Sequence, residues 1–386
     1  MTLLQFVGKN SRRNPRRSAM TVLSIGFSLL LLTFLISLWH AFYQDNGPPD
    51  DALRLLTRHR VSLSFLLPGF YRERIRKVPG VVAVVPWNWI GNHYKDDKPE
   101  HFFAQYATDP DEVFHVVSDW TIAPDQLRAW QRDVAGAAVE RRLAATQGWK
   151  LGDHLFLQKN LYPVDLELTV RALYDAPPEA SALLFNWKML EAGNTFLRDK
   201  TDTFLLRVDA PASVPAVEAG IDDQFRNAPA PTRTETQKAF QLDFLNSLGN
   251  IKAFIIAIAA AVSFAILLVA ANTMAMTVRE RTREVAVLKT IGFPRHLILE
   301  MFLGEALMLA WIGGGLGILA AGWLLAAVAA SPQLTLFAGF FRRAHITGPT
   351  VLFGMLVAAC VGLLSAALPA YRAARLNIVA GLRHVG

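Results

Sequence analysis

Four long apolar runs constrain this sequence more than any other feature. A helix needs about 20 mostly apolar residues to cross the core of a bilayer. The first run, residues 20–42, reaches that length without a single Lys, Arg, Asp or Glu. A cleaved signal peptide is the alternative, but this run is long for one and no A-x-A-like site follows it. We therefore predict four transmembrane helices, with their backbone groups bonded internally, at residues 20–43, 250–277, 297–330 and 347–371.

The distribution of positive charge predicts which side of the membrane each loop occupies, because Lys and Arg gather on the cytoplasmic side. Basic residues are concentrated in three segments: 1–19, 278–296 and 372–386. With four spans these segments share one side, so we expect both termini to be cytoplasmic in a plasma or inner cell membrane. Arg342 and Arg343, in the predicted outer connection 331–346, count against this orientation.

The region 44–249 has the composition of an ordinary soluble domain and is expected outside the cytoplasm. Gly80 to Pro86 is predicted as a buried strand that the proline ends. Two further strands are expected at residues 166–173 and 203–208. A helix broken near Gly136 is expected over 126–147, and loops are expected at 211–218 and 228–232. The predicted fold class is therefore a membrane protein of four transmembrane α-helices, with a large α+β domain inserted between helices 1 and 2.

Several functional classes find no support in the sequence. The net charge of +7 comes from basic residues beside apolar runs, so it indicates membrane orientation rather than nucleic-acid binding. The one cysteine, Cys360, allows no intrachain disulfide, and no Cys/His spacing indicates a metal site. The pairs Asp96-Asp97 and Asp222-Asp223 are interpreted as solvated charge. Because G-x-S-x-G and H-E-x-x-H are also absent, we expect no catalytic residue, metal or cofactor in this chain.

The segment 278–298, VRERTREVAVLKTIGFPRHLI, is the most informative part of the sequence. Val278, Val285, Leu288 and Ile291 fall on one broad helical stripe. Gly292 ends the predicted helix and Pro294 suits the start of the next. A short amphipathic helix between two spans needs a partner for its apolar face. Two alternatives are open on physical grounds: the helix lies on lipid headgroups, or it docks into a groove of a soluble protein.

This segment resembles the R-E-R-T-R-E-I-G-V-L-K-A-L-G-A pattern that follows the second span in the MacB/LolC/FtsX superfamily of ABC transporter permeases. Glu305 with its following glycines resembles the third span of that family. The ending PAYRAARLNIVAGLRHV resembles the family's tail, with Asn377 and Ile378 in place of Asp-Pro. VPGVVAVVP and VERRLAATQGWKLGDHLFL resemble segments of its MacB-like periplasmic core domain. In that family the first pattern contacts the ATPase, which implies coupling residues here: Arg281, Arg283, Glu284, Val285, Leu288, Lys289, Ile291 and Gly292.

The resemblance also implies partners and a function. The sequence contains neither a G-x-x-x-x-G-K-[ST] loop nor an LSGGQ-like signature, so ATP and Mg²⁺ are expected on a separate ABC ATPase chain. A homodimer, or a heterodimer with a paralogous permease, and often a periplasmic adaptor are implied. The expected function is export of a small molecule, peptide or lipoprotein by mechanical coupling between the ATPase and the outer domain. The alternative is transmembrane signalling that activates a cell-wall hydrolase.

Three residues of the third span are singled out for their positions. Glu305 is a carboxylate about two turns inside a span, which marks a functional candidate by default. Its alternative role is structural: reaching the interface or pairing with an arginine such as Arg372. Gly313 and Gly317 have the spacing that lets two membrane helices approach closely, and packing within one protomer is favoured over a dimer seam.

Overall fold

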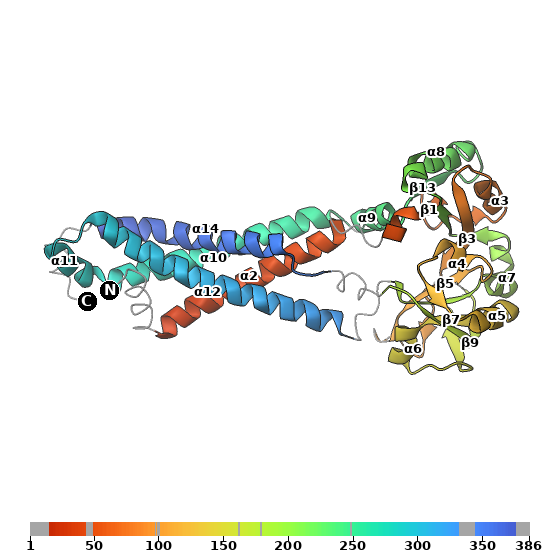
Figure 1. Cartoon of the computed structure of the whole chain (residues 1–386), viewed down its shortest axis with the longest axis horizontal. Coiled ribbons are helices and arrows are strands. Elements are labelled where there is room, and N and C mark those ends of the chain that lie inside the picture. The colour runs from red at the N-terminus through yellow and green to blue at the C-terminus, as the bar shows by residue number, and fades with distance from the viewer. Residues whose placement is uncertain are drawn as a thin grey trace. The chain divides into compact units, whose positions relative to one another are not determined.

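The computed structural model of the chain describes residues 15–43, 49–96, 98, 101–160, 163–177, 180–247, 249–331 and 344–375. The chain divides into two compact units, shown in Figure 1. The helical unit comprises Met1–Phe42, Asn250–Ala327 and Ala344–Gly386, and the sheet unit comprises Tyr43–Gly249 and Val328–Arg343. Most of the predicted basic arm, outer connection and tail, including Arg342 and Arg343, lies outside the described residues.

The helical unit contains the four apolar helices. They are α2 (Pro15–Tyr43), α10 (Ile251–Glu280), α12 (Arg295–Ala329) and α14 (Gly348–Ala374). Among the described residues, these four are long and apolar enough to cross a membrane. A fifth helix, α11 (Thr282–Thr290), lies at one end of this unit. The helices extend up to five residues beyond the predicted spans, because polar residues at the ends of apolar runs continue the helix.

The helical unit is held together by a small apolar core to which all four long helices contribute. Its buried members are Ile25, Leu29, Leu32, Ile266, Ala270, Ala310, Ala358 and Val361. Helices α2 and α12 approach most closely at glycines. A Cβ added at Gly313 would lie 2.9 Å from the carbonyl oxygen of Val22, and one at Gly26 would lie 3.2 Å from that of Gly313. Gly313 and Gly317 therefore face α2 of the same chain, the kind of contact that small residues permit between membrane helices.

The sheet unit is built on one long, mixed sheet. Its strand order is β13-β1-β12-β3-β5-β10-β7-β9-β8-β4, with β6 also paired to β9. Two pairs, β5/β10 and β7/β9, are parallel, and the others are antiparallel. The strands are β1 (Arg54–His59), β3 (Val81–Trp89), β4 (His93–Tyr94), β5 (Ala104–Thr108), β6 (Thr121–Ile122), β7 (Gly136–Glu140), β8 (His154–Gln158), β9 (Leu166–Asp175), β10 (Ala182–Asn186), β12 (Thr203–Val208) and β13 (Thr232–Thr236). A separate two-stranded sheet pairs β2 (Leu67–Pro68) with β11 (Lys200–Thr201).

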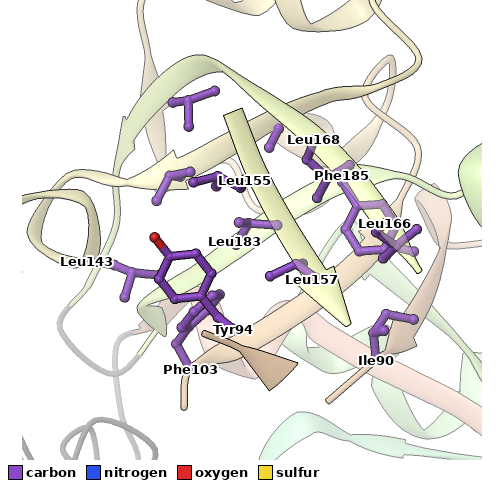
Figure 2. Packing of buried hydrophobic residues seen from close by; sticks show 14 of the residues in the cluster. Ile90, Tyr94, Phe103, Leu143, Leu155, Leu157, Leu166, Leu168, Leu183 and Phe185 are labelled. Atoms are coloured by element: carbon purple, nitrogen blue, oxygen red, sulfur yellow. The ribbon is translucent and has the colours of Figure 1, made fainter. Parts of the chain in front are cut away.

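The central strands of this sheet are buried on both faces. Successive side chains of a strand point to opposite faces, and in β10 Leu183 and Phe185 join one core cluster whereas Leu184 joins another. Figure 2 shows the first cluster, in which Leu155 and Leu157 of β8 pack against these residues. The second cluster includes Trp130 and Tyr174. Flanking helices cover the faces: α4 (Val113–Val116), α5 (Pro124–Arg132), α6 (Arg141–Gln147) and α7 (Lys188–Gly193).

A third core lies under the other part of the sheet. Helices α3 (Tyr71–Arg76) and α8 (Val214–Gln224) contribute Tyr71, Ile75, Val217 and Ile221 to it. The rings of Tyr71 and Phe225 stack with centroids 4.0 Å apart. This aromatic contact is of the offset-stacked kind that stabilises cores beyond area burial.

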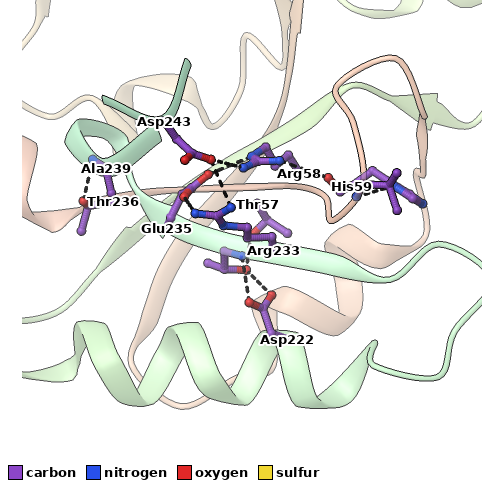
Figure 3. Close-up of polar contacts among 11 residues, drawn as sticks. Thr57, Arg58, His59, Asp222, Arg233, Glu235, Thr236, Ala239 and Asp243 are labelled. Carbon is purple, nitrogen blue, oxygen red and sulfur yellow. Dashed lines mark hydrogen bonds and ion pairs between the residues drawn. The ribbon is translucent and has the colours of Figure 1, made fainter. Parts of the chain in front are cut away.

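Helix α9 (Gln237–Ser247), which directly precedes α10 in the chain, is joined to the sheet by ion pairs (Figure 3). Arg58 of β1 donates to Glu235 of β13 and to Asp243 of α9, each at 2.8 Å. Arg233 also reaches Asp243, at 3.1 Å. On the other face of β13, Asp222 of α8 accepts hydrogen bonds from Thr232 and Thr234. Asp222 is thus a structural side chain rather than merely solvated charge.

The predicted fold class is confirmed, but three local predictions in the sheet unit are wrong. Pro86 lies inside β3, opposite Phe204, at a position where β5 does not yet pair with β3, so its missing N–H is tolerated. The helix predicted over 126–147 is broken near Gly136 as expected, but a strand, β7, separates its two parts, because residues 137–139 are fully buried within the sheet and burial overrides the helix propensity of alanine. The loop predicted at 211–218 is largely α8, whose Val217 and Ile221 are one turn apart and face the core.

Candidate coupling site

The candidate site begins at a break between two helices. Helix α10 ends at Glu280, and the backbone of Arg281 (φ −98°, ψ 10°) leads directly into α11. The N–H of Arg281 donates to the carbonyl of Thr277, and its own carbonyl accepts from Val285 at 2.9 Å. Arg281 therefore closes one helix and opens the next, so its conformation sets the direction in which α11 leaves α10.

Gly292 terminates α11. Its φ of +98° lies in the left-handed region, which glycine adopts at little cost. The N–H of Gly292 donates to Lys289, and the N–H of Phe293 donates to Leu288, both at 3.1 Å. No atom lies within 4 Å of a Cβ built at Gly292, so the backbone angle and not crowding favours glycine here. Helix α12 then begins at Arg295, one residue after Pro294.

One member of the predicted apolar stripe belongs to the protein's own core. Val285 is 1% exposed and packs with Ile298, Met301 and Phe302 of α12, and with Ala370, Ala373 and Ala374 of α14. Leu288 is half-buried, and Ile291 is 71% exposed. Val285 therefore anchors α11 to its own chain and is not available to a partner, because a side chain in helical packing cannot also line an outer surface.

The exposed apolar side chains at this end are Val287, Ile291 and Phe293, which we name the coupling edge. Their exposed fractions are 42%, 71% and 45%. Val287 and Ile291 are four residues apart and so lie on one side of the turn that ends α11. Val287 and Phe293 were not predicted as site residues, because the predicted apolar stripe runs through Val285. The i, i+4 spacing of Val287 and Ile291 was a signal that could have identified Val287.

Charged side chains accompany the coupling edge. Arg283 and Glu284 are exposed, and Lys289 is half-buried. Burial, together with the nearby charge of Arg295, lowers the pKa of the Lys289 ammonium from its ordinary value of 10.5. This end of the helical unit thus combines apolar side chains with mixed charge, a composition typical of the rim and core of a protein interface.

Glu305 is paired, and its partner is Arg281 rather than Arg372. The guanidinium donates from Nη1 to Oε2 at 2.6 Å and from Nη2 to Oε1 at 3.3 Å. The side chains of Arg281 and Glu305 are 14% and 5% exposed. Two parallel N–H···O bonds match the planar fork of arginine to the two oxygens of a carboxylate. Glu305, predicted as a functional candidate, therefore binds Arg281, predicted as a coupling residue.

A metal site finds no support at this end of the unit or elsewhere in the described part of the chain. Among those residues, no group of three or more His, Cys, Asp or Glu side chains is arranged to hold a metal ion. What the arrangement offers is a short helix held at its base, with apolar side chains exposed at its far end. Exposed apolar side chains on a fixed helix end are suited to contact with a partner.

Four helices of spanning length, with this helix at one end and an α+β unit inserted in the sequence, define a multi-pass membrane protein. Residues 253–378 match the family model described as FtsX-like permease C-terminal. The helical unit therefore contains an FtsX-like permease domain, as the resemblance in the sequence implied. The matched residues include all of α11, the coupling edge and Glu305.

Curated relatives match a little under a third of the chain, 29% in each case below. The pyoverdine export ATP-binding/permease protein PvdT of Pseudomonas syringae pv. syringae (strain B728a) is 42% identical over 116 residues, which cover 29% of this chain and 16% of PvdT. YvrN of Bacillus subtilis (strain 168), an uncharacterized ABC transporter permease, is 36% identical over 113 residues, covering 29% of this chain and 26% of YvrN. The matched stretch is thus a minor part of each relative's length.

The sheet unit is similar to two solved domains. One is the periplasmic region of MacB from Actinobacillus actinomycetemcomitans, with a TM-score of 0.38 and 10% identity over 50% of this chain and 93% of that one. The other is the extracellular domain of the noncanonic ABC-type transporter YknZ from Gram-positive bacteria, with a TM-score of 0.36 and 8% identity over 47% of this chain and 99% of that one. Both scores are low, and the function proposed below rests on the helical unit.

Proposed function

We propose that this chain is the permease subunit of an ABC transporter and that the coupling edge docks onto a separate ATPase chain. The observation that carries the proposal is the exposure of Val287, Ile291 and Phe293 on a segment that is itself anchored by Val285. Scattered apolar side chains on a surface need no explanation, but a cluster at a fixed helix end marks an interaction site. The FtsX-like match over the same residues supports an ABC-type partner.

The orientation proposed for the chain places α11 and both termini in the cytoplasm, where an ATPase is found. This orientation is supported by the basic residues near this end of the unit, because cytoplasmic loops carry an excess of Lys and Arg. These residues are Arg279, Arg281, Arg283, Lys289, Arg295, Arg372 and Arg375. The sheet unit is then extracytoplasmic, and the protein resides in a plasma or inner cell membrane.

In this proposal ATP and Mg²⁺ bind to the partner, whose movement is transmitted through the helices to the sheet unit. The work performed is export of a small molecule, peptide or lipoprotein, and the similarity to proteins named for pyoverdine export favours export over signalling. A second permease copy or a paralogous permease completes the complex, often with a periplasmic adaptor. Mechanical coupling of this kind requires two global states that each partner biases differently.

The test is retention of the ATPase by wild type and by two surface variants. Each ABC ATPase of the source genome that lacks a permease domain is co-expressed with the tagged permease in membranes. Burying an isoleucine is worth roughly 1.5–3 kcal/mol, so Ile291→Asp should weaken binding by at least about ten-fold. Lys289→Ala, a neighbouring change at the rim, should have a much smaller effect that shrinks with added salt.

Two results would contradict the proposal. One is equal recovery of an ATPase by wild type and Ile291→Asp, as expected if the coupling edge only rests on lipid headgroups. The other is retention of no ATPase by the wild-type chain. The purified permease alone should show no ATP hydrolysis above background.

A further inference from the structure

The Arg281–Glu305 pair connects the base of α11 to a helix that is rigidly packed elsewhere. Glu305 lies on α12, and the next residue, Ala306, faces α14. A Cβ built at Gly362 of α14 would lie 2.7 Å from the Cβ of Ala310 and 3.1 Å from the carbonyl oxygen of Ala306. Helices α12 and α14 are therefore in near-backbone contact around Glu305. Because close-packed elements move together, Glu305 is fixed to a block formed by both helices.

Arg281, by contrast, sits at a joint. It is the single residue between α10 and α11, and its backbone belongs to the hydrogen-bond ladders of both helices. Because only one residue separates α10 from α11, the backbone itself does little to fix the angle between the two helices. The packing of Val285 fixes one side of α11, and the bidentate ion pair fixes the residue from which α11 starts. The angle is thus determined at two points.

Burial decides what such a pair contributes. Desolvating two ions costs about as much as their attraction returns, so a buried pair is poor evidence for stability. Removing one partner, however, leaves an uncompensated charge in a poorly hydrated site, which is strongly unfavourable. The ion pair therefore has two favourable states. In one, both carboxylate oxygens of Glu305 accept from Arg281; in the other, the pair is broken and water hydrates the two charges. A contact with this property selects one geometry of the joint.

We propose that Arg281 and Glu305 are positioning residues that hold α11 at a fixed angle to α10 and connect it to the α12/α14 block. A force applied to α11 is then delivered to α10, α12 and α14 together, instead of being absorbed by bending at Arg281. The transmission of force rests on the function proposed above, whereas the fixed angle is a property of this chain alone. The pair contributes to coupling, and the coupling edge contributes to binding.

The angle between α10 and α11 is tested in the purified chain without the ATPase, reconstituted in lipid nanodiscs. With Cys360 replaced by Ala, spin labels are attached at Asn272→Cys on α10 and Thr290→Cys on α11, both exposed positions, and their distance distribution is measured. Wild type should give one narrow distance. Arg281→Gln and Glu305→Gln should each lose the single narrow distance, and the exchange of both residues, Arg281→Glu with Glu305→Arg, should restore it at least in part. Arg279→Gln, an exposed arginine of the same helix end, is the matched control and should leave the distribution unchanged.

Unchanged distributions in both single variants would overturn the proposal, whatever the ATPase does. If a single variant fails to fold, Arg281→Lys replaces it. Lysine keeps the charge but lacks the fork, so the narrow distance should still broaden, and its persistence would overturn the proposal equally. With the ATPase present, Glu305→Gln should retain binding but lose the ATP-dependent change of the same distance. Loss of binding in wild type would instead contradict only the proposed function.

Discussion

Asp243 of α9 accepts a hydrogen bond from Arg58 of β1 at 2.8 Å, although 185 residues separate them in the chain. Arg58 is largely buried, lies 6.0 Å from the ring centroid of Phe240, and bonds Glu235 as well. This contact fastens α9 to the sheet unit (Figure 3). Helix α9 therefore belongs to the sheet unit although it leads directly into a membrane helix.

Removing this contact should release α9. We expect Asp243→Asn to leave the sheet unit folded and to reduce local stability at α9 by about 1 kcal/mol, because Asp243 is partly exposed and such pairs are weak. Hydrogen exchange followed by mass spectrometry should show faster exchange in α9 and little change in β9. Glu167→Gln removes an exposed carboxylate from β9 and is the control. Equal exchange of α9 in the two variants would show that the ion pairs do not hold it.

The glycine contact between α2 and α12 makes a position-specific prediction. A Cβ at Gly317 would meet the carbonyl oxygen of Gly26 and lie 3.0 Å from the backbone nitrogen of Leu30. Backbone atoms cannot turn aside, so Gly317→Ala should lower stability by about 1–3 kcal/mol. Gly315→Ala has no atom within 4 Å of the new methyl group and should be neutral or slightly stabilising. Thermal unfolding in detergent compares the two, and equal midpoints would refute close packing at Gly317.

Substitutions at Val285 and Ile291 should affect different properties, the stability of the helical unit in the first case and ATPase binding in the second. Val285→Ala opens a cavity among Ile298, Phe302 and Ala370, and should cost about 2 kcal/mol in the helical unit. Ile291→Ala removes a side chain that is 71% exposed, so the thermal unfolding of the isolated chain should hardly change. Retention of the ATPase should fall in Ile291→Ala. A large loss of stability in Ile291→Ala would place that residue in the core instead.

His59 gives the sheet unit a defined pH dependence. Its Nδ1 accepts a hydrogen bond from the N–H of Val61 at 3.2 Å, which requires that nitrogen to be unprotonated. Burial, aided by the charge of Arg60, lowers the pKa of the His59 imidazole from its ordinary 6.5. The unfolded chain therefore binds more protons between the folded pKa and 6.5, so stability is present above pH 6.5 and is lost as the pH falls through that window.

The control for this prediction is His59→Asn, whose Oδ1 keeps an acceptor near the position of Nδ1 and does not titrate. Unfolding midpoints are measured from pH 8 down to pH 5. The wild type should lose more stability than His59→Asn over this range. Parallel curves would mean that His59 does not contribute to the pH dependence.

Orientation is tested by labelling intact cells with a membrane-impermeant thiol reagent, in a background with Cys360→Ala. Ala145→Cys lies at an exposed position of α6 and should be labelled from outside. Arg283→Cys lies at an exposed position of α11 and should react only after the membrane is permeabilised. Labelling of Arg283→Cys in intact cells would reverse the proposed orientation.

The membrane part of this fold is readily predicted from sequence, because length and hydropathy alone specify a spanning helix. The sheet unit is harder. The segment 137–139, Ala-Ala-Val, has no alternating pattern because both of its faces are buried, and a strand of this kind resembles a helix in sequence. Only its neighbours, β9 and β10, make it a strand, and they lie far away in the chain.

The helix of the candidate site was predicted from the sequence, but not which of its apolar side chains pack inward. The helix and its end at Gly292 follow from local pattern, and the cost of a charge in a span singles out Glu305 as a candidate. Helical periodicity, however, cannot distinguish an apolar residue that packs inward from one that faces a partner. Val285 and Ile291 looked equivalent on the stripe, and only the position of α12 and α14 separates them. The partner of Glu305 is likewise determined by the break at Arg281, a tertiary feature.

The first and last of the described strands of the sheet unit, β1 and β13, are neighbours in the sheet. The chain enters the sheet at the start of β1 and leaves it at the end of β13, where Leu55 and Thr236 are register partners. Adjacent strands are about 4.8 Å apart, so the first and last strands of the sheet unit lie side by side. Insertions with close ends can be lost, gained or exchanged without disturbing the host. Under the function proposed above, the module that recognises cargo could then be exchanged while α11 and the coupling edge are inherited unchanged.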